Sequence, residues 1–192
     1  NELTNLQKLD LYGTKITDAG LVHLKNLTNL RHLYLNRTNV TGAGLAHLKG
    51  LQLASLAIPR DAKTDLGLKH YLAALGTYTA LNLGGWNITD AGLPHLKGLT
   101  NLQSLGLGGP KITDAGLVHL KGLTNLQTLN LGGTKITDAR LARLAGMNLK
   151  KLTILIHDRS DGVLQLSMRG DVHITILDLS FWKITDAGLV HL

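Results

Sequence analysis

Residue types that serve in hydrolysis and in cation binding occur together in the stretch His157-Asp158-Arg159-Ser160-Asp161. A catalytic site also needs partner residues, and the spacing of the rest of the sequence brings none to this stretch. The sequence has no nucleophile elbow and no phosphate-binding glycine loop followed by Lys-Ser or Lys-Thr. The equivalent stretch earlier in the chain, Asp61 to Asp65, lacks the histidine. We therefore interpret residues 157–161 as a polar turn and predict that the chain is not an enzyme.

Histidine is the second candidate for chemistry, because the chain has nine of them. Six share one position of a sequence repeat: His23, His47, His70, His95, His119 and His191. Neighbouring helices pack about 8–10 Å apart, whereas two imidazoles that share a zinc ion must each bring a nitrogen to about 2 Å from it. Arg143 and Leu166 also interrupt the row. We therefore predict a solvated flank, with no metal and no cofactor.

The net charge of +7 raises the possibility of an acidic partner or nucleic acid. The lysines, however, recur at fixed repeat positions near the end of each predicted helix and just after each predicted strand. A cation in the last turn of a helix interacts favourably with the helix dipole. A nucleic-acid interface would need stacking aromatics among the lysines, and the chain has only two Trp, four Tyr and one Phe. We do not expect a nucleic-acid partner.

The elements that carry these residues follow from a 24-residue repeat, which begins near residues 3, 27, 51, 75, 99, 123, 147 and 171. In the repeat 99–122, leucines alternate with polar or small residues at 102–107, a pattern typical of a short strand with one buried face. Gly108-Gly109-Pro110 ends the strand, and Thr113-Asp114 is suited to begin a helix. Leu117 and Leu120 then form an apolar stripe. Each repeat is predicted to be a strand, a turn and a short helix.

A fixed period of this length indicates a solenoid, in which each repeat covers the apolar face of its neighbour. Parallel strands lie about 4.8 Å apart, closer than the helices can pack. The stack must therefore curve. We predict an α/β solenoid of about eight repeats, with one curved parallel sheet on the concave side and short helices on the convex side.

The amino-acid sequence of the repeat resembles leucine-rich repeats, for example in Ile112-Thr113-Asp114 followed by Leu117. More narrowly it is similar to the cysteine-containing-like, F-box-type subtype and to bacterial leucine-rich-repeat proteins. The resemblance covers essentially all 192 residues and implies a single domain, 1–192. The cysteine position of that subtype is occupied here by other residues, so we expect the side-chain ladder there to be discontinuous. The chain has no F-box-like segment, so ubiquitin-ligase function does not carry over. The residues at the cysteine position are Thr14, Thr38, Asp61, Trp86, Pro110, Thr134, His157 and Trp182.

A longer period is superimposed on the short one. The repeats that begin at Leu51 and Met147 both lack one residue near their start and both run into a charged stretch. Each is followed by a repeat with a tryptophan, Trp86 or Trp182, and these features lie 96 residues apart. The pattern predicts a duplicated four-repeat block, 1–96 and 97–192. Coincidence within a degenerate repeat is the alternative.

Binding in this architecture is expected on the concave strand positions that point away from the core. A polar aromatic patch near the N-terminal end carries side-chain types that dominate binding energies, and a more apolar patch lies near the other end. Between the two patches lie several glycines, which leave the surface without side chains. These glycines either let a partner's backbone approach closely or serve the turns. The polar patch comprises Tyr12, His32, Tyr34, Arg37 and Arg60. The apolar patch comprises Leu155, Ile156, Ile176 and Phe181.

These features predict a non-catalytic scaffold that recognises a protein or peptide. The alternative is a structural module that stacks end to end. Asn1 and Glu2 occupy the last two positions of a repeat, and Leu192 lies two positions before the end of a repeat. Joining the two ends of the chain would therefore continue the 24-residue register. We expect either an excerpt of a longer array or such a module.

No apolar window is long enough to cross a membrane, and no signal peptide is evident. The chain has no cysteine, which leaves the compartment open.

Overall fold

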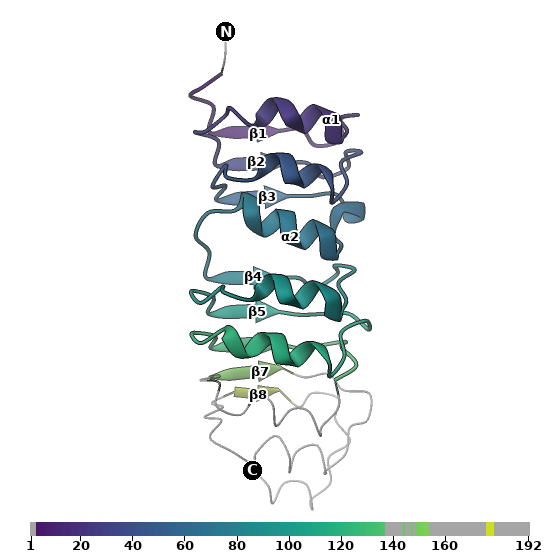
Figure 1. The fold of residues 1–192 in the computed structure, drawn as a ribbon, viewed down its shortest axis with the longest axis vertical. Helices are drawn as coiled ribbons and strands as arrows, with labels where there is room; N and C mark the ends of the chain where they lie inside the picture. The colour runs from purple at the N-terminus through teal and green to yellow at the C-terminus, as the bar shows by residue number, and fades with distance from the viewer. Residues whose placement is uncertain (1–2, 137–143, 145–146, 148, 154–175, 179–192) are drawn as a thin grey trace, which may run out of the picture. The chain divides into compact units, whose positions relative to one another are not determined.

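A three-residue strand recurs every 23 to 25 residues along the chain. The computed structural model describes residues 3–136, 144, 147, 149–153 and 176–178. It divides into two compact units, Asn1–Tyr78 and Thr79–Leu192, here called unit 1 and unit 2. In each unit, helices cover one face of a parallel sheet (Figure 1).

Unit 1 contains a three-stranded parallel sheet with the order β1-β2-β3. The register places Lys8 opposite His32, and His32 opposite Ser55. The chain that leaves the last helix of unit 1 pairs through Leu75 with Leu53, just before β3. The elements are β1 (Lys8–Asp10), α1 (Asp18–Leu21), η1 (Val22–Leu24), β2 (His32–Tyr34), η2 (Gly44–Leu48), β3 (Ser55–Ala57), η3 (Arg60–Ala62) and α2 (Asp65–Ala74).

Unit 2 contains a five-stranded parallel sheet with the order β4-β5-β6-β7-β8. Its register aligns Ala80, Ser104, Thr128, Lys151 and Ile176. The described strands thus form two sheets, where the sequence had predicted one. The elements are β4 (Ala80–Asn82), η4 (Asp90–Leu96), β5 (Ser104–Gly106), η5 (Gly116–Gly122), β6 (Thr128–Asn130), β7 (Lys151–Thr153) and β8 (Ile176–Asp178).

The strand starts also repeat at the longer distance. Residues 8, 32, 55 and 80 begin β1 to β4, and residues 104, 128, 151 and 176 begin β5 to β8, each 96 residues later. The shortened third repeat and the lengthened fourth therefore recur at the same places in both halves. This spacing agrees with the pattern that predicts a duplication, which stays a prediction.

The core lies between strands and helices and consists almost entirely of the repeated leucines. In unit 2 the inward strand residues Leu105 and Leu107 and the helix residues Leu117 and Leu120 are at most 1% exposed. Burying such a side chain contributes about 1.5–3 kcal/mol. Most of the helices are 3-10 rather than α, and a 3-10 helix rises about 2.0 Å per residue, so it spans the repeat with few residues. The predicted short helices are confirmed.

After each strand comes the repeat position at which the cysteine-containing subtype has its cysteine. In this chain different residues occupy that position and make different contacts. Thr38 and Thr134 are buried, and each hydroxyl donates a 2.7 Å hydrogen bond to the carbonyl oxygen three residues earlier. Thr14 makes the same bond at 2.8 Å on the surface. Trp86 takes this position in the fourth repeat and is 8% exposed. A hydroxyl satisfied by its own turn and a packed indole thus occupy the same place.

The aspartate of Ile-Thr-Asp joins neighbouring repeats, which the sequence analysis did not foresee. Asp90 accepts hydrogen bonds from the backbone nitrogen of Thr113 at 2.8 Å and from its Oγ1 at 2.6 Å. Asp18 holds Thr41 in the same way, at 2.7 and 2.6 Å. The expected capping is also present, since the Thr89 hydroxyl accepts a bond from the backbone nitrogen two residues later.

Candidate functional site

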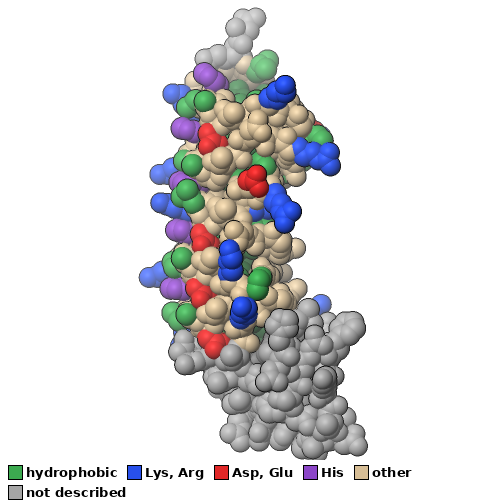
Figure 2. All heavy atoms as spheres, turned by 90° about the vertical axis from the view of Figure 1, so that its right-hand side faces the viewer, with side chains coloured by type: hydrophobic (Ala, Val, Ile, Leu, Met, Phe, Trp, Pro, Cys, Tyr) green, Lys and Arg blue, Asp and Glu red, His purple; other side chains and the backbone are tan. Residues whose placement is uncertain are grey.

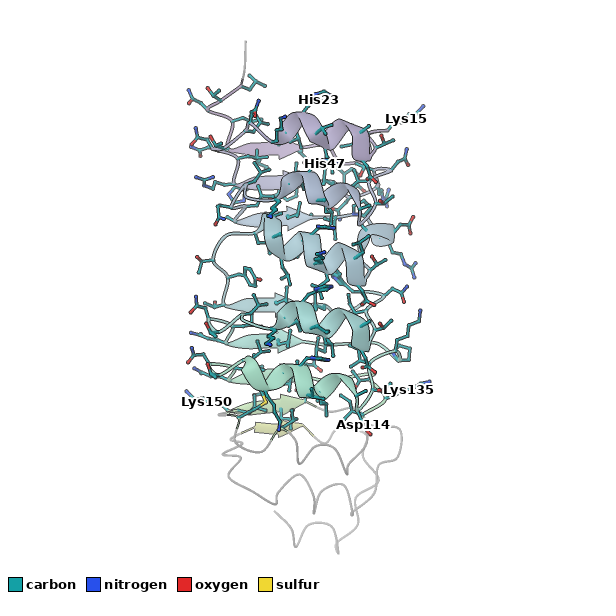
Figure 3. The ribbon with its side chains drawn as sticks, viewed as in Figure 1. Lys15, His23, His47, Asp114, Lys135 and Lys150 are labelled. Carbon is teal, nitrogen blue, oxygen red and sulfur yellow. The ribbon has the colours of Figure 1, made fainter. Side chains whose placement is uncertain are left out.

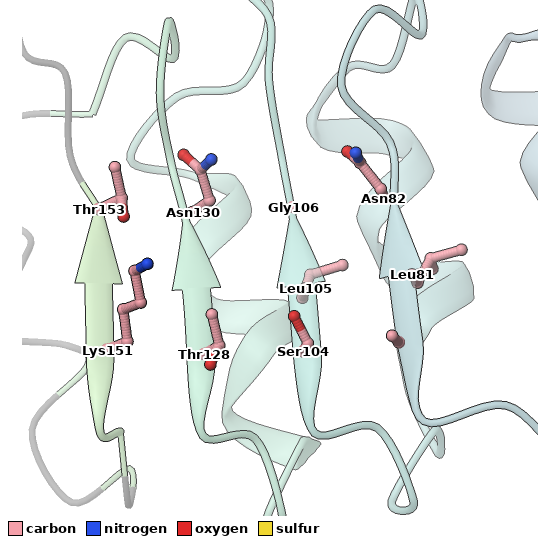
Figure 4. A pocket seen from close by; sticks show the side chains of 10 residues that line it. Leu81, Asn82, Ser104, Leu105, Gly106, Thr128, Asn130, Lys151 and Thr153 are labelled. Carbon is pink, nitrogen blue, oxygen red and sulfur yellow. The ribbon is translucent and has the colours of Figure 1, made fainter.

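The outward side chains of unit 2 lie in two rows across β4 to β7 (Figure 4). They line a hollow with a volume of about 370 Å³, here called the strand groove. Its walls carry hydroxyl and amide groups and one cation, Lys151, with no carboxylate among the lining residues. Such a lining can bind the backbone and polar side chains of a partner. The lining residues are Ala80, Leu81, Asn82, Ser104, Leu105, Gly106, Thr128, Asn130, Lys151 and Thr153.

The last residue of several strands is oriented by the loop that follows it. The Oδ1 atom of Asn82 accepts a 2.9 Å hydrogen bond from the backbone nitrogen of Gly84, and Asn130 accepts one of 2.8 Å from Gly132. In unit 1, Asp10 accepts the same bond from Tyr12 at 2.9 Å. These side chains are held in place before any partner arrives, which lowers the entropic cost of binding.

The glycines beside the strand groove serve the turns and the stacking of repeats. Gly85, Gly109 and Gly133 have φ values of 77°, 136° and 76°, in the region that favours glycine. A Cβ atom on Gly106 would lie 2.8 Å from Asn82 Oδ1, so a larger residue there would displace that amide. The interpretation of these glycines as turn residues therefore holds at Gly85, Gly109 and Gly133.

The predicted polar patch lies on the corresponding face of unit 1, and here it is called the tyrosine–arginine patch (Tyr12, His32, Tyr34, Arg37, Arg60). The guanidinium carbon of Arg37 lies 5.5 Å from the centre of the Tyr12 ring. The ammonium of Lys8 lies 5.3 Å from the centre of the Tyr34 ring. These distances fit cation–π contacts between neighbouring repeats. Lys8 was not part of the predicted patch, although it lies on β1, four residues before Tyr12.

His32 and Arg60 complete the tyrosine–arginine patch. His32 Nδ1 lies 3.4 Å from Ser55 Oγ of the next strand. Arg60 is exposed and begins η3 directly after β3. Because His32 pairs with Ser55, Arg60 occupies the same repeat position as Arg37. The structure therefore places the five predicted residues on or directly after three neighbouring strands.

Arg37 has a backbone conformation that other repeats reserve for glycine. Its φ is 58°, and the equivalent residues Gly13, Gly85, Gly109 and Gly133 have φ between 69° and 136°. A non-glycine residue in this region is uncommon and costs conformational energy. The sequence alignment of the repeats contained this signal, because an arginine replaces a glycine there.

The apolar patch is largely outside the part of the chain that the structure describes. Leu155, Ile156 and Phe181 lie there, as does the stretch 157–161. Ile176 is in β8, opposite Lys151 in the register. The apolar patch therefore stays a prediction.

Charged side chains also occur away from the strand faces. Figure 2 views the side at which the strands end, and His and Lys or Arg side chains alternate along one of its borders. His23 and His47 lie on the helical side of unit 1 (Figure 3). Within the described residues, no group of three His, Cys, Asp or Glu side chains could hold a metal ion. Nor is any helix of the described chain long and apolar enough to span a membrane.

Two tyrosines outside both surfaces titrate abnormally. Burial and, to a smaller extent, the nearby Tyr71 together raise the pKa of Tyr78 to about 12. Burial also raises the pKa of Tyr71. Both tyrosines therefore stay protonated over the physiological range.

Parallel strands that repeat along the chain, followed in its described part by helices around a leucine core, define the chain as an α/β solenoid protein. Family models for leucine-rich repeats match residues 4–55 (two copies), 122–139 and 171–192. Internalin C2 from Listeria monocytogenes strain 4b F2365 has a similar structure, with 25% sequence identity and a TM-score of 0.50, over 93% of this chain and 80% of that chain. No curated protein matches the sequence. The chain therefore contains leucine-rich repeats and has a leucine-rich-repeat fold.

Proposed function

We propose that this chain is a non-catalytic recognition module that binds a protein or peptide on its concave, strand-lined face. Leucine-rich-repeat proteins generally act as scaffolds for protein interactions and are typically not enzymes. The observation that carries the proposal is the strand groove, whose hydroxyl and amide groups face outward beside Lys151. An extended segment laid across such a groove exchanges hydrogen bonds with these groups and excludes water.

The tyrosine–arginine patch supports the same function on unit 1. Tyrosine and arginine are enriched at the centres of interfaces because they combine a large contact area with directional polar groups. Tyr12 is 56% exposed, and Arg37 lies over its ring. The part of the surface opposite the strands presents the helices instead.

A displayed library of random peptides, selected on the intact chain, tests this proposal. Single tryptophan substitutions then block one surface at a time: Ser55→Trp in unit 1 and Ser104→Trp in unit 2. The matched controls are Val22→Trp and Val118→Trp, at exposed helical positions. We expect the selected peptides to lose about tenfold or more in affinity with at least one strand-face variant, and to keep it with the helical ones. Peptides blocked only by the helical variants would contradict the proposal, as would a library that yields no binder.

End-to-end stacking stays an alternative prediction. The residues that would form the contact, near Asn1 and Leu192, lie outside the described part of the chain. Light scattering of the intact chain at increasing concentration decides between the two, because stacking requires the mean mass to rise with concentration.

A further inference from the structure

Two arginines mark the ends of neighbouring strands in unit 1. Arg37 follows β2 and Arg60 follows β3 at the same repeat position. At this position Gly13, Gly85 and Gly133 have a positive φ, and Arg37 has one too, at 58°, whereas Arg60 does not. The conformation is disfavoured for a residue with a side chain. Strained backbone of this kind is concentrated at functional sites.

The side chain of Arg37 is positioned by the Tyr12 ring, but no carboxylate of the described residues neutralises its charge. Its guanidinium lies 5.5 Å from the centre of the Tyr12 ring. A guanidinium stacked on a ring keeps its N–H donors in its own plane, where they can grip a carboxylate through two parallel bonds. Among the described residues, the structure gives neither Arg37 nor Arg60 an ion pair or a side-chain hydrogen bond. Both cations are exposed to solvent.

Positive charge dominates the edge of unit 1 that is formed by its strands and the turns after them. Lys8, on β1, lies 5.3 Å from the centre of the Tyr34 ring, and Lys15 lies on the side at which the strands end (Figure 3). Lys63 follows η3. The carboxylates on the strands and in the turns are Asp10, whose Oδ1 already accepts the Tyr12 N–H, and Asp61. Asp18 and Asp65 come later, at the helix starts, and Asp18 is held by Thr41. The cations at this edge therefore outnumber the acids.

We propose that the tyrosine–arginine patch binds an extended acidic peptide, with two carboxylates of the partner paired to Arg37 and Arg60. This rests on the proposed function of the strand face. Neighbouring parallel strands lie about 4.8 Å apart, and alternate side chains of an extended peptide are about 7 Å apart on one side. Two flexible arginines readily span that difference.

The probe is a fluorescent peptide that alternates Glu and Thr, compared with a matched peptide that alternates Gln and Thr. Anisotropy titrations of the intact chain at low salt should show the Glu peptide binding at least about tenfold more tightly, and added salt should reduce the difference. Arg37→Gly should weaken Glu-peptide binding about fivefold or more. This substitution restores the glycine that the other repeats carry, so the fold is preserved, and circular dichroism checks this. Lys25→Gln removes an exposed cation on the helical side and should change affinity less than about twofold.

Several results would overturn the proposal. Equal affinity for the Glu and Gln peptides would remove the role of the carboxylates, and unchanged affinity in Arg37→Gly would remove the role of this arginine. A single-stranded oligonucleotide that binds as tightly, with the same dependence on Arg37, would make the patch a nucleic-acid site. If library peptides are blocked by Ser55→Trp or Ser104→Trp but are neither acidic nor sensitive to Arg37→Gly, the proposed function stands and this inference fails. If only the helical variants block them, the proposed function fails first.

Discussion

Asp90→Ala tests how the repeats are held in register behind the strand groove. The substitution removes the carboxylate that accepts hydrogen bonds from Thr113 N at 2.8 Å and Thr113 Oγ1 at 2.6 Å. A hydrogen bond to a charged group contributes about 1.5–3 kcal/mol. Asp90 is half-buried, and water partly replaces the lost bonds, so the lower end of that range applies. Two bonds at this lower end sum to about 3 kcal/mol at most, so we expect the free energy of unfolding of unit 2 to fall by about 2–3 kcal/mol.

The assay is urea unfolding followed by the fluorescence of Trp86, which is buried in the same repeat as Asp90. A Trp182→Phe background removes the second tryptophan signal. Thr113→Ala and the double variant complete a mutant cycle, and the coupling energy should be about 1 kcal/mol or more. Asp18→Ala is the matched control, because it breaks the same contact in unit 1 and should leave the Trp86 transition in place. A loss below about 0.5 kcal/mol for Asp90→Ala, or strict additivity in the cycle, would refute the reasoning.

The remaining predictions concern packing, pH and a buried hydroxyl. Gly67→Ala should destabilise unit 1 by about 2–3 kcal/mol, because its Cβ would meet the backbone carbonyl oxygen of Ala62, whereas Gly122→Ala, with open space around it, should be near neutral. Urea unfolding followed by far-ultraviolet circular dichroism measures both variants, because unit 1 contains no tryptophan. Because burial raises the pKa of Tyr78 to about 12, the unfolded chain loses this proton first above about pH 10. Stability should therefore fall between about pH 10 and pH 12, and Tyr78→Phe should flatten that loss in thermal melts; an identical pH profile would contradict this. Thr134→Val should cost about 1 kcal/mol, since its buried hydroxyl donates to a carbonyl oxygen, and an unchanged urea midpoint would argue against that bond.

The strand positions could be predicted from sequence because they depend on a local pattern that recurs. Leu105 and Leu107 alternate with small or polar residues in the same way as their equivalents, and both are buried. Period-two burial and a glycine turn are enough to place a strand. The same pattern located Tyr12 and Arg37 on one face, and the structure brings them into contact.

The contacts between repeats could not be predicted, because they depend on geometry that one repeat does not contain. Asp90 was assigned to helix capping, yet its carboxylate reaches Thr113 in the next repeat. The division into two sheets was missed for a related reason. It falls after α2, the ten-residue α-helix of the repeat that begins with β3, and the next strand, β4, begins 25 residues after β3. Single-repeat patterns do not report how strands pair.

The positions of the strand groove were expected to face outward on the concave side, but they were not singled out as a preferred site. Its lining residues, such as Ser104 and Thr128, are small and unremarkable singly, and they form a surface only when the register aligns them. Sequence reasoning favoured large aromatic and charged residues, because those types dominate known binding energies. A hollow lined with small residues carries no such signal.

Photocrosslinking tests the central claim of strand-face recognition most directly. A photoreactive phenylalanine analogue is placed at Thr128, in the strand groove, or at Val118, an exposed helical position of the same unit. Each variant is irradiated with a library-selected peptide that Ser104→Trp blocks. We predict a crosslink from position 128 and none from position 118. A crosslink from position 118 alone would place the peptide on the helices and contradict the account.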